Sequence, residues 1–429
     1  MGMLFVFILL SVCAATVVRL PIVFYYTIRE CQSGLPKYIW HSLSQAVESQ
    51  TDCDVILISN VNEMCKDVKS PLFPQGISLV SDISIISEKS RLFMSTTSSL
   101  FGPDHLWTAS ALRFFLFEDY MKIYNVSVLI HVEADNLLYG RLTHGALEFL
   151  LKGYRGLAAT PLTHIMMTAS IFWVGNVHSL SKFNNYLLEL GTNSTGGLSK
   201  YVNWLYGTYA CCKAGGRYPR QNNMGLRPYA FSEMTMLSHY HYEAGGRHEL
   251  SYLPIIPFGA DVRKKIDIKN WNLTDYTPNG KDIEYPTGAG IWDSGSYGQN
   301  LGGTMVHGRG FAELGHFIGH GLIKGGCVVK FMCGRTFSEA AVDLNKGNLE
   351  LGIKYIKNLD SSIVFGLNVT DIIQESKICR SGPYVKCHNE KHMPLWNLHV
   401  HSKKTSVFRS TICLCRDLSE MPYEIPYEM

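Results

Sequence analysis

The 429-residue sequence has few charged residues, since Lys, Arg, Asp and Glu together make up only 17% of it. The formal net charge is +3, and no long run of Lys or Arg occurs. Proteins that bind nucleic acid through its phosphates usually carry a basic patch or stripe. The composition therefore argues against a nucleic acid partner.

Several catalytic motifs are also missing. The sequence contains neither the Gly-x-Ser-x-Gly elbow of α/β-hydrolases nor a P-loop Gly-Lys-Ser/Thr. His316 and His320 have the spacing of a zinc protease helix, but Phe317 stands where such a helix needs Glu. Four glycines in 307–320 also disfavour a helix. We therefore interpret 307–320 as a metal-free, Gly-rich loop.

Hydrophobic residues, by contrast, are abundant at 46%, with 12% aromatics, which is ample for a large core. No stretch in the middle of the chain has the composition of a linker. Residues 20–28 form a predicted strand, a helix opens near Pro36, and 54–60 form a second apolar strand. This βαβ spacing predicts an α/β fold.

The most informative stretch is an apolar run, 126–132, that ends in acidic residues. The run is typical of a strand buried on both faces. Glu133 and Asp135 follow it, and alternation along a strand would point both carboxylates the same way. Ligands bind at the carboxyl ends of strands in open α/β sheets, and hard oxygen ligands suit Mg²⁺ or Mn²⁺. The alternative is a strand that exits into solvent through a polar turn.

Four further features lie in colinear order along the chain. They are the helical stretch 107–121, IHVEADNLLY (130–139), IWDSGSYGQNLGG (291–303) and LWNLHVHSK (395–403). Together they resemble segments of glycosyltransferases of the GT-A fold that use nucleotide sugars. The resemblance implies an α/β, GT-A-like (Rossmann-like) mixed sheet flanked by helices, in a single large catalytic domain over 20–415. Residues 20–190 would then bind the nucleotide sugar, and 191–415 would form the acceptor side and complete the metal site.

The same resemblance implies a metal site. Glu133 and Asp135 would bind Mn²⁺ or Mg²⁺ together with a late histidine, either His401 or His399. His401 is favoured somewhat because Lys403 follows it closely. The alternative is that both histidines lie on a solvated strand.

For the donor, the resemblance implies that Arg113 and Lys403 contact the diphosphate. Arg113 lies among phenylalanines, so its guanidinium needs an anionic partner. That partner would otherwise be a structural carboxylate such as Glu118 or Asp119.

Four more residues would lie at the edge of the nucleotide pocket. They are Tyr26, Thr27, Asn60 and Asn136. The alternative is that Tyr26, Thr27 and Asn60 are ordinary polar residues at the ends of strands.

On the acceptor side we expect 191–231, rich in Gly, Asn, Tyr and Arg, to be a long irregular loop. Two acidic residues are candidates for the base that activates the acceptor hydroxyl, Asp293 first and Glu233 second. Asp293 could instead cap a short helix.

The two ends of the chain have distinct compositions. Residues 1–18 are apolar and short for a membrane span, which favours a signal peptide or a short signal anchor that tethers the protein to a membrane. A buried first strand is the other interpretation. Residues 416–429 form a predicted mobile tail. Four glycosylation sequons, at Asn125, Asn193, Asn272 and Asn368, fit a secretory route.

Together these features predict a metal-dependent glycosyltransferase of the Golgi or ER lumen, or a secreted one. It would move a sugar from a nucleotide-sugar donor, with a UDP-sugar favoured, to a glycan, glycoprotein or glycolipid acceptor. The alternative is a catalytically inactive GT-A-like protein that binds sugars or acts as a scaffold.

Overall fold

A computed structural model gives the structure of the chain. Residues 19–253 are described apart from 29–34, 67–72, 102–104, 140–141, 144–150, 164–165, 194 and 211–230. Shorter described pieces follow at 292, 328–331, 383–386, 392–394, 396–399 and 403.

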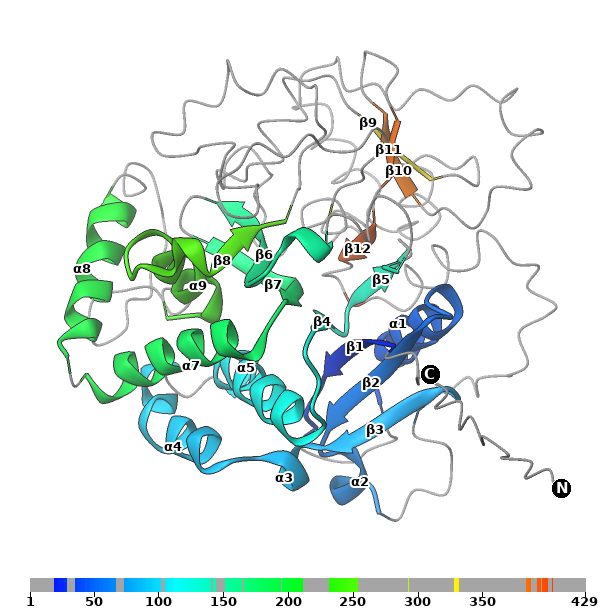
Figure 1. The fold of residues 1–429 in the computed structure, drawn as a ribbon, viewed down its shortest axis with the longest axis horizontal. Coiled ribbons are helices and arrows are strands. Elements are labelled where there is room, and N and C mark those ends of the chain that lie inside the picture. The colour runs from blue at the N-terminus through cyan, green and yellow to red at the C-terminus, as the bar shows by residue number, and fades with distance from the viewer. Residues whose placement is uncertain are drawn as a thin grey trace, which may run out of the picture.

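A seven-stranded mixed sheet forms the centre of the described part (Figure 1). Its strand order is β3-β2-β1-β4-β7-β6-β8. The first four strands in this order are parallel, whereas β7 runs antiparallel to both β4 and β6. The strands are β1 (Leu20–Tyr25), β2 (Cys53–Ser59), β3 (Ile77–Ser81), β4 (Leu129–Val132), β6 (Leu157–Thr163), β7 (Met166–Val174) and β8 (Leu250–Tyr252).

Helices cover both faces of this sheet. Alternation along the strands divides the core, so that in β1 Val23 packs into one cluster while Ile22 and Phe24 pack into the other. The first cluster includes side chains of α4 (Glu88–Thr96), α5 (His105–Ile123), α7 (Val177–Thr192), α8 (Gly197–Ala210) and α9 (Glu233–Tyr242). The second includes α1 (Lys37–Ser49), which begins directly after Pro36. Short helices α2 (Val61–Met64), α3 (Asp82–Ile85), η1 (Ser98–Phe101) and η3 (Gly246–His248) lie in the connections.

Helix α5 is buried around most of its circumference. Phe114 packs edge-on against Phe172 of β7 and Phe183 of α7. The same helix buries charged residues, including Arg113 at 4% exposure and Glu118 at 1%. Burying a charge is unfavourable unless it is paired, so each of these groups needs a partner from elsewhere in the fold.

A two-stranded ladder joins distant parts of the chain. Strand β12 (Asn397–His399) runs antiparallel to β5 (Asn136–Leu138), and His399 pairs with Asn136. Asn397 Nδ2 donates to Asn136 Oδ1 at 2.6 Å, across 261 positions of sequence. Strands β9 (Val328–Phe331), β10 (Pro383–Lys386) and β11 (His392–Pro394) form a separate small sheet. The residues just after Asp135 are therefore fixed by the β12 strand.

The predicted α/β class with a mixed, helix-flanked sheet is confirmed. The expectation that all of 191–231 is irregular was wrong, because 197–210 form helix α8. Tyr201 and Leu205, four positions apart, are fully buried on one face of α8, which is the helical period that the glycine-rich composition concealed.

Other predictions fall outside the described residues. These are the leader 1–18, the Gly-rich loop 307–320 and the tail 416–429. None of the described helices combines the length and the apolar character that a membrane crossing requires. Whether the chain is divided as predicted, at 20–190 and 191–415, stays a prediction.

Candidate metal and donor site

The two acids of the sequence motif lie in a turn just beyond β4 rather than on the strand itself. The amide of Glu133 still donates to Ser170 O of β7 at 2.9 Å, and the amide of Asn136 donates to Glu133 O at 3.0 Å. The chain then enters β5. Both carboxylates consequently lie at the carboxyl end of a buried central strand, as expected.

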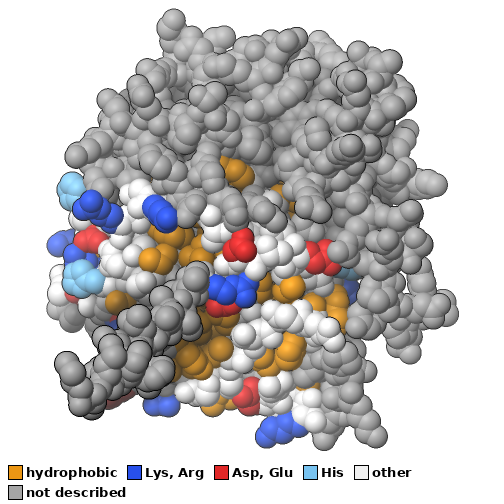
Figure 2. Space-filling model, turned by 45° about the vertical axis from the view of Figure 1, so that its right-hand side comes forward, with side chains coloured by type: hydrophobic (Ala, Val, Ile, Leu, Met, Phe, Trp, Pro, Cys, Tyr) orange, Lys and Arg blue, Asp and Glu red, His pale blue; other side chains and the backbone are white. Residues whose placement is uncertain are grey.

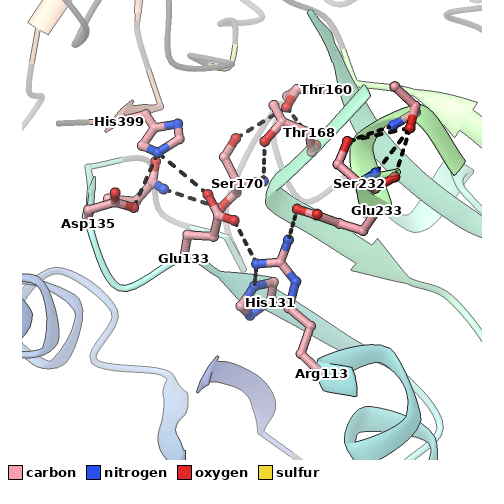
Figure 3. Close-up of polar contacts among 12 residues, drawn as sticks. Arg113, His131, Glu133, Asp135, Thr160, Thr168, Ser170, Ser232, Glu233 and His399 are labelled. Carbon is pink, nitrogen blue, oxygen red and sulfur yellow. Dashed lines mark hydrogen bonds and ion pairs between the residues drawn. The ribbon is translucent and has the colours of Figure 1, made fainter. Parts of the chain in front are cut away.

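His399 of β12 joins these two acids to make a group of three potential metal ligands. Its Nε2 lies 3.2 Å from Asp135 Oδ1 and 3.5 Å from Glu133 Oε2. One ligand atom from each of the three residues falls within 4.8 Å of the others. Figure 3 shows His399 and the two carboxylates pointing toward one another. We call Glu133, Asp135 and His399 the acid–histidine cluster.

The chemistry of the acid–histidine cluster fits a divalent cation. Two carboxylates and one imidazole offer oxygen and nitrogen ligands of the kind that Mn²⁺ accepts, and Mg²⁺ accepts the oxygens. Lys403 Nζ lies 3.7 Å from Asp135 Oδ2, and its side chain is 46% exposed. A cation at the cluster would have this ammonium group beside it, suited to an anionic ligand.

Arg113 connects the cluster to Glu233 of α9. Its Nη1 donates to Glu133 Oε1 at 2.6 Å, and its Nη2 donates to Glu233 Oε1 at 3.2 Å. In Figure 3 the side chain of Arg113 rises from α5 between the two carboxylates. The alternative expected a structural carboxylate as the partner of Arg113, and two carboxylates of the protein do pair with it. The residues named for that role, Glu118 and Asp119, were wrong, because they bind other groups.

His131 of β4 is a third partner of Arg113. Its Nδ1 lies 2.8 Å from Val23 O, which can only accept, so Nδ1 carries the proton and Nε2 accepts from Arg113 Nη1 at 3.2 Å. Burial lowers the pKa of His131 well below its usual value, and the Arg113 charge lowers it further. His131 thus supports Arg113 as a neutral ring. The sequence did not single it out, although it lies two positions before Glu133 within an apolar strand.

Glu233 begins α9 and is 3% exposed. Ser232 caps this helix, in a capping box with Thr235. Burial raises the pKa of Glu233 to about 7, with a further rise from Glu133, while Arg113 and the backbone amides of Glu233 and Met234 oppose the rise. The carboxylate therefore changes charge near neutral pH.

The residues predicted at the nucleotide pocket take different positions. Asn60 bridges two loops, since its side chain accepts from the amide of Ile28 and donates to Ile28 O, both at 2.8 Å. Asn136 is fully buried and donates to Ser170 O at 3.3 Å. Both amide side chains are thus engaged by the protein itself.

The two other residues predicted at the nucleotide pocket, Tyr26 and Thr27, follow β1 and are half-buried. Tyr26 hydrogen-bonds Tyr38 of α1, whose ring lies 5.8 Å from Lys403 Nζ. Burial raises the pKa of Tyr38, as do Tyr26 and the charge of Asp135. Tyr38 therefore lies beside Lys403, which itself contacts Asp135 of the acid–histidine cluster. The sequence did not single out Tyr38.

Asp293 and His401 lie outside the described residues, so their predicted roles stay predictions. The neighbour of Asp293, Trp292, is fully buried, and its ring packs against Trp396 at 5.1 Å between centroids. Trp396 immediately precedes β12.

On the face drawn in Figure 2, the described Lys and Arg side chains are scattered among acidic and uncharged ones. This distribution agrees with the low net charge of +3.

No protein-family model matches the sequence, and a search of curated proteins finds no relative. Solved structures that match include a glycosyltransferase, PaToxG, at 11% identity and TM-score 0.28, covering 53% of this chain and 71% of that one. Mouse xyloside xylosyltransferase 1 matches at 13% identity and TM-score 0.34, covering 55% and 85%. The galactosyltransferase LgtC, in complex with donor and acceptor sugar analogues, matches at 10% identity and TM-score 0.30, covering 62% and 85%. These neighbours are GT-A glycosyltransferases. Because the TM-scores are below 0.5, we draw no functional conclusion from them.

Proposed function

We propose that this protein is a metal-dependent glycosyltransferase that uses a nucleotide-sugar donor. The observation that carries the proposal is the meeting of Glu133 and Asp135 with His399, which comes from a strand more than 260 positions later. Only the fold brings these groups together, and their chemistry suits Mn²⁺ or Mg²⁺.

The charges around the site support a cation that itself binds an anion. Glu133, Asp135 and Glu233 are opposed by Arg113 and by the half-exposed Lys403. A bound divalent ion would neutralise charge that develops on a diphosphate leaving group.

The protein's own groups would prepare that chemistry. Lys403 stands beside Asp135 where it could contact the outer oxygens of a diphosphate. Tyr38 and Tyr26 provide ring surface next to that position. Arg113 is engaged by two carboxylates, so we assign it to holding Glu133 rather than to the diphosphate.

The acceptor, the sugar and the cellular location belong to the proposal in its finer form. We propose a UDP-sugar donor, a carbohydrate-bearing acceptor and a secretory location. Two sequon asparagines, Asn125 and Asn193, are exposed at turns, where a glycan could be attached.

The test is calorimetric titration of the purified protein with Mn²⁺, with UDP, and with UDP in the presence of Mn²⁺. It is followed by a screen for donor hydrolysis across nucleotide sugars. We expect UDP to bind more tightly with Mn²⁺ present and at least one donor to be hydrolysed. Metal-dependent binding of nucleotides without turnover of any donor would favour the sugar-binding or scaffold alternative. Absence of Mn²⁺ binding would contradict the assigned site.

A further inference from the structure

Glu133 uses its two carboxylate oxygens differently. Oε1 accepts the 2.6 Å hydrogen bond from Arg113 Nη1, while Oε2 faces His399 Nε2 at 3.5 Å. Partners outside the ligand set commonly orient metal ligands in this way. The direction of Oε2 therefore depends on where the Arg113 guanidinium lies.

Arg113 is held from the opposite side by Glu233. The Nη2–Oε1 distance is 3.2 Å, and both side chains are about 95% buried. Glu233 stands on the first turn of α9, whose cap is formed by Ser232 and Thr235, and α9 packs against β7. A planar guanidinium between two carboxylates has little freedom to rotate.

We propose that Glu233 is a positioning residue for the metal site: through Arg113 it fixes Glu133 so that Oε2 faces Asp135 and His399. The inference rests on the proposed metal-dependent function. It differs from the base role expected from the sequence, in which Glu233 would face an acceptor hydroxyl. A carboxylate that is 3% exposed and paired with Arg113 suits an internal support better than contact with an incoming substrate.

Charge makes this role measurable. When Glu233 is ionised it shares the Arg113 guanidinium with Glu133, so the cluster is more negative and attracts a cation more strongly. When Glu233 is neutral, Arg113 compensates Glu133 alone and competes with the cation. Among the described residues, the titratable groups facing Glu233 are Arg113 from α5 and Glu133 from the turn after β4, with neutral His131 behind Arg113.

The experiment compares Mn²⁺ binding by calorimetry in the full-length wild-type protein and in Glu233→Gln, at pH 6 and pH 8. Glutamine keeps the shape of Glu233 and removes its charge. Since the pKa of Glu233 is about 7, the wild type resembles the variant at pH 6 and differs from it at pH 8. We expect the variant to bind Mn²⁺ about tenfold more weakly at pH 8 and within about twofold of wild type at pH 6. At each pH the ratio of the two dissociation constants measures the contribution of the Glu233 charge, because the two proteins differ only at that residue.

Glu118→Gln is the matched control. Glu118 is also a buried carboxylate in ion pairs, and it lies on α5, but its partners are Lys89 and Lys122. We expect its Mn²⁺ affinity to equal that of wild type at both pH values. Weakening as large as that in Glu233→Gln would overturn the proposal, since any buried ion pair would then matter.

Two further outcomes would overturn the role of Glu233 but leave the proposed function intact. One is that Glu233→Gln and wild type bind Mn²⁺ equally well at pH 8, and the other is that the variant binds Mn²⁺ more weakly to the same extent at both pH values. If Glu233→Gln does not fold, Arg113→Lys is measured in its place. Lysine keeps the positive charge of Arg113 but lacks the planar guanidinium that donates to Glu133 and Glu233 at once. We expect Arg113→Lys to bind Mn²⁺ about tenfold more weakly at both pH values. Unchanged Mn²⁺ binding in this variant would overturn the proposal. If the wild type does not bind Mn²⁺, the proposed function fails together with this inference.

Discussion

Helix α5 carries two buried charged groups whose surroundings are opposite in kind. Glu118 pairs with two cations: Lys89 Nζ lies 2.9 Å away, and Lys122 follows one turn later. The neutral amide of Asn184 adds a hydrogen bond, with Nδ2 donating at 2.7 Å. Arg113, five positions earlier, is a single cation that serves both Glu133 and Glu233. The Glu118 network has an excess of positive charge, whereas the Arg113 network has an excess of negative charge.

The pKa shifts of the two glutamates express this difference. Burial alone would raise the pKa of Glu118, but hydrogen bonds from Lys122, Asn184 and Lys89 lower it below its usual value. Burial raises the pKa of Glu233 to about 7 because one shared guanidinium cannot offset it. Buried acids with a raised pKa, like Glu233, are common at functional sites. The comparison teaches that the Glu118 network neutralises its acid within the fold, while the Arg113 network leaves the excess negative charge that the proposed metal site requires.

The strongest test of that contrast is Asp135→Asn, which removes a ligand charge from the acid–histidine cluster. We expect Mn²⁺ affinity to fall by more than about 100-fold, beyond the loss typical of an outer partner, and donor turnover to disappear. Calorimetry and the hydrolysis assay measure both. Asp119→Asn is the matched control, since Asp119 is equally buried on α5 but accepts from Ser87 and Ser90. An unchanged Mn²⁺ affinity in Asp135→Asn would remove the assigned site.

Next in size is the pH dependence of stability in Glu233→Gln. A folded-state pKa raised from 4.5 to about 7 gives stability that is present below pH 4.5 and is lost as the pH rises through 7. The corresponding free energy is roughly 3 kcal/mol. We therefore expect the free energy of unfolding of wild type to fall by about that amount relative to the variant between pH 4.5 and pH 8, measured by urea unfolding. A difference in stability that stays constant across this range would show that burial does not raise the pKa of Glu233.

Glu118→Gln should behave in the opposite sense. A lowered folded-state pKa gives stability that is present above the unfolded value of about 4.5 and is lost as the pH falls through the folded one. We expect the variant to be less stable than wild type by about 2 kcal/mol at pH 7, with the gap narrowing in acid. Urea unfolding at pH 7 and pH 3 measures the gap. Lys122→Met should lose less than about 1 kcal/mol because that ammonium group is largely exposed.

The smallest expected effect belongs to Lys403→Ala. Lys403 is 46% exposed and lies 3.7 Å from Asp135, so its repulsion of a bound cation is screened by solvent. We expect Mn²⁺ to bind roughly two- to threefold more tightly in the variant, and UDP in the presence of Mn²⁺ to bind more weakly. Separate titrations resolve these opposite changes. If both affinities fell together, Lys403 would be supporting the structure of the cluster instead.

Local pattern predicted much of the fold. The apolar runs of β1, β2 and β4 and the helical stretch of α5 can each be recognised within one element. Helix α8 was not predicted because its glycines and tyrosines are typical of loops, although Tyr201 and Leu205 repeat at the helical period. Hydrophobic periodicity is therefore a weak signal in a helix whose composition resembles that of a loop.

The site was only partly accessible from sequence. The acids at 133 and 135 were found by their position after a buried strand, and the late histidine pair only by resemblance to GT-A enzymes. Sequence spacing could not indicate that Arg113 meets Glu233, because 120 positions separate them and helices α5 and α9 must pack together before they touch. His131 was missed because a lone histidine in an apolar strand is more often a core residue.

The ladder between β5 and β12 has a consequence for biosynthesis. A ribosome finishes the acidic turn early, but the imidazole that faces it is made only after some 260 further residues have been added. We expect a nascent chain to assemble the seven-stranded sheet while that third ligand is still missing. The proposed metal site would then be completed late in translation, after residue 399 leaves the ribosomal exit tunnel and β12 pairs with β5.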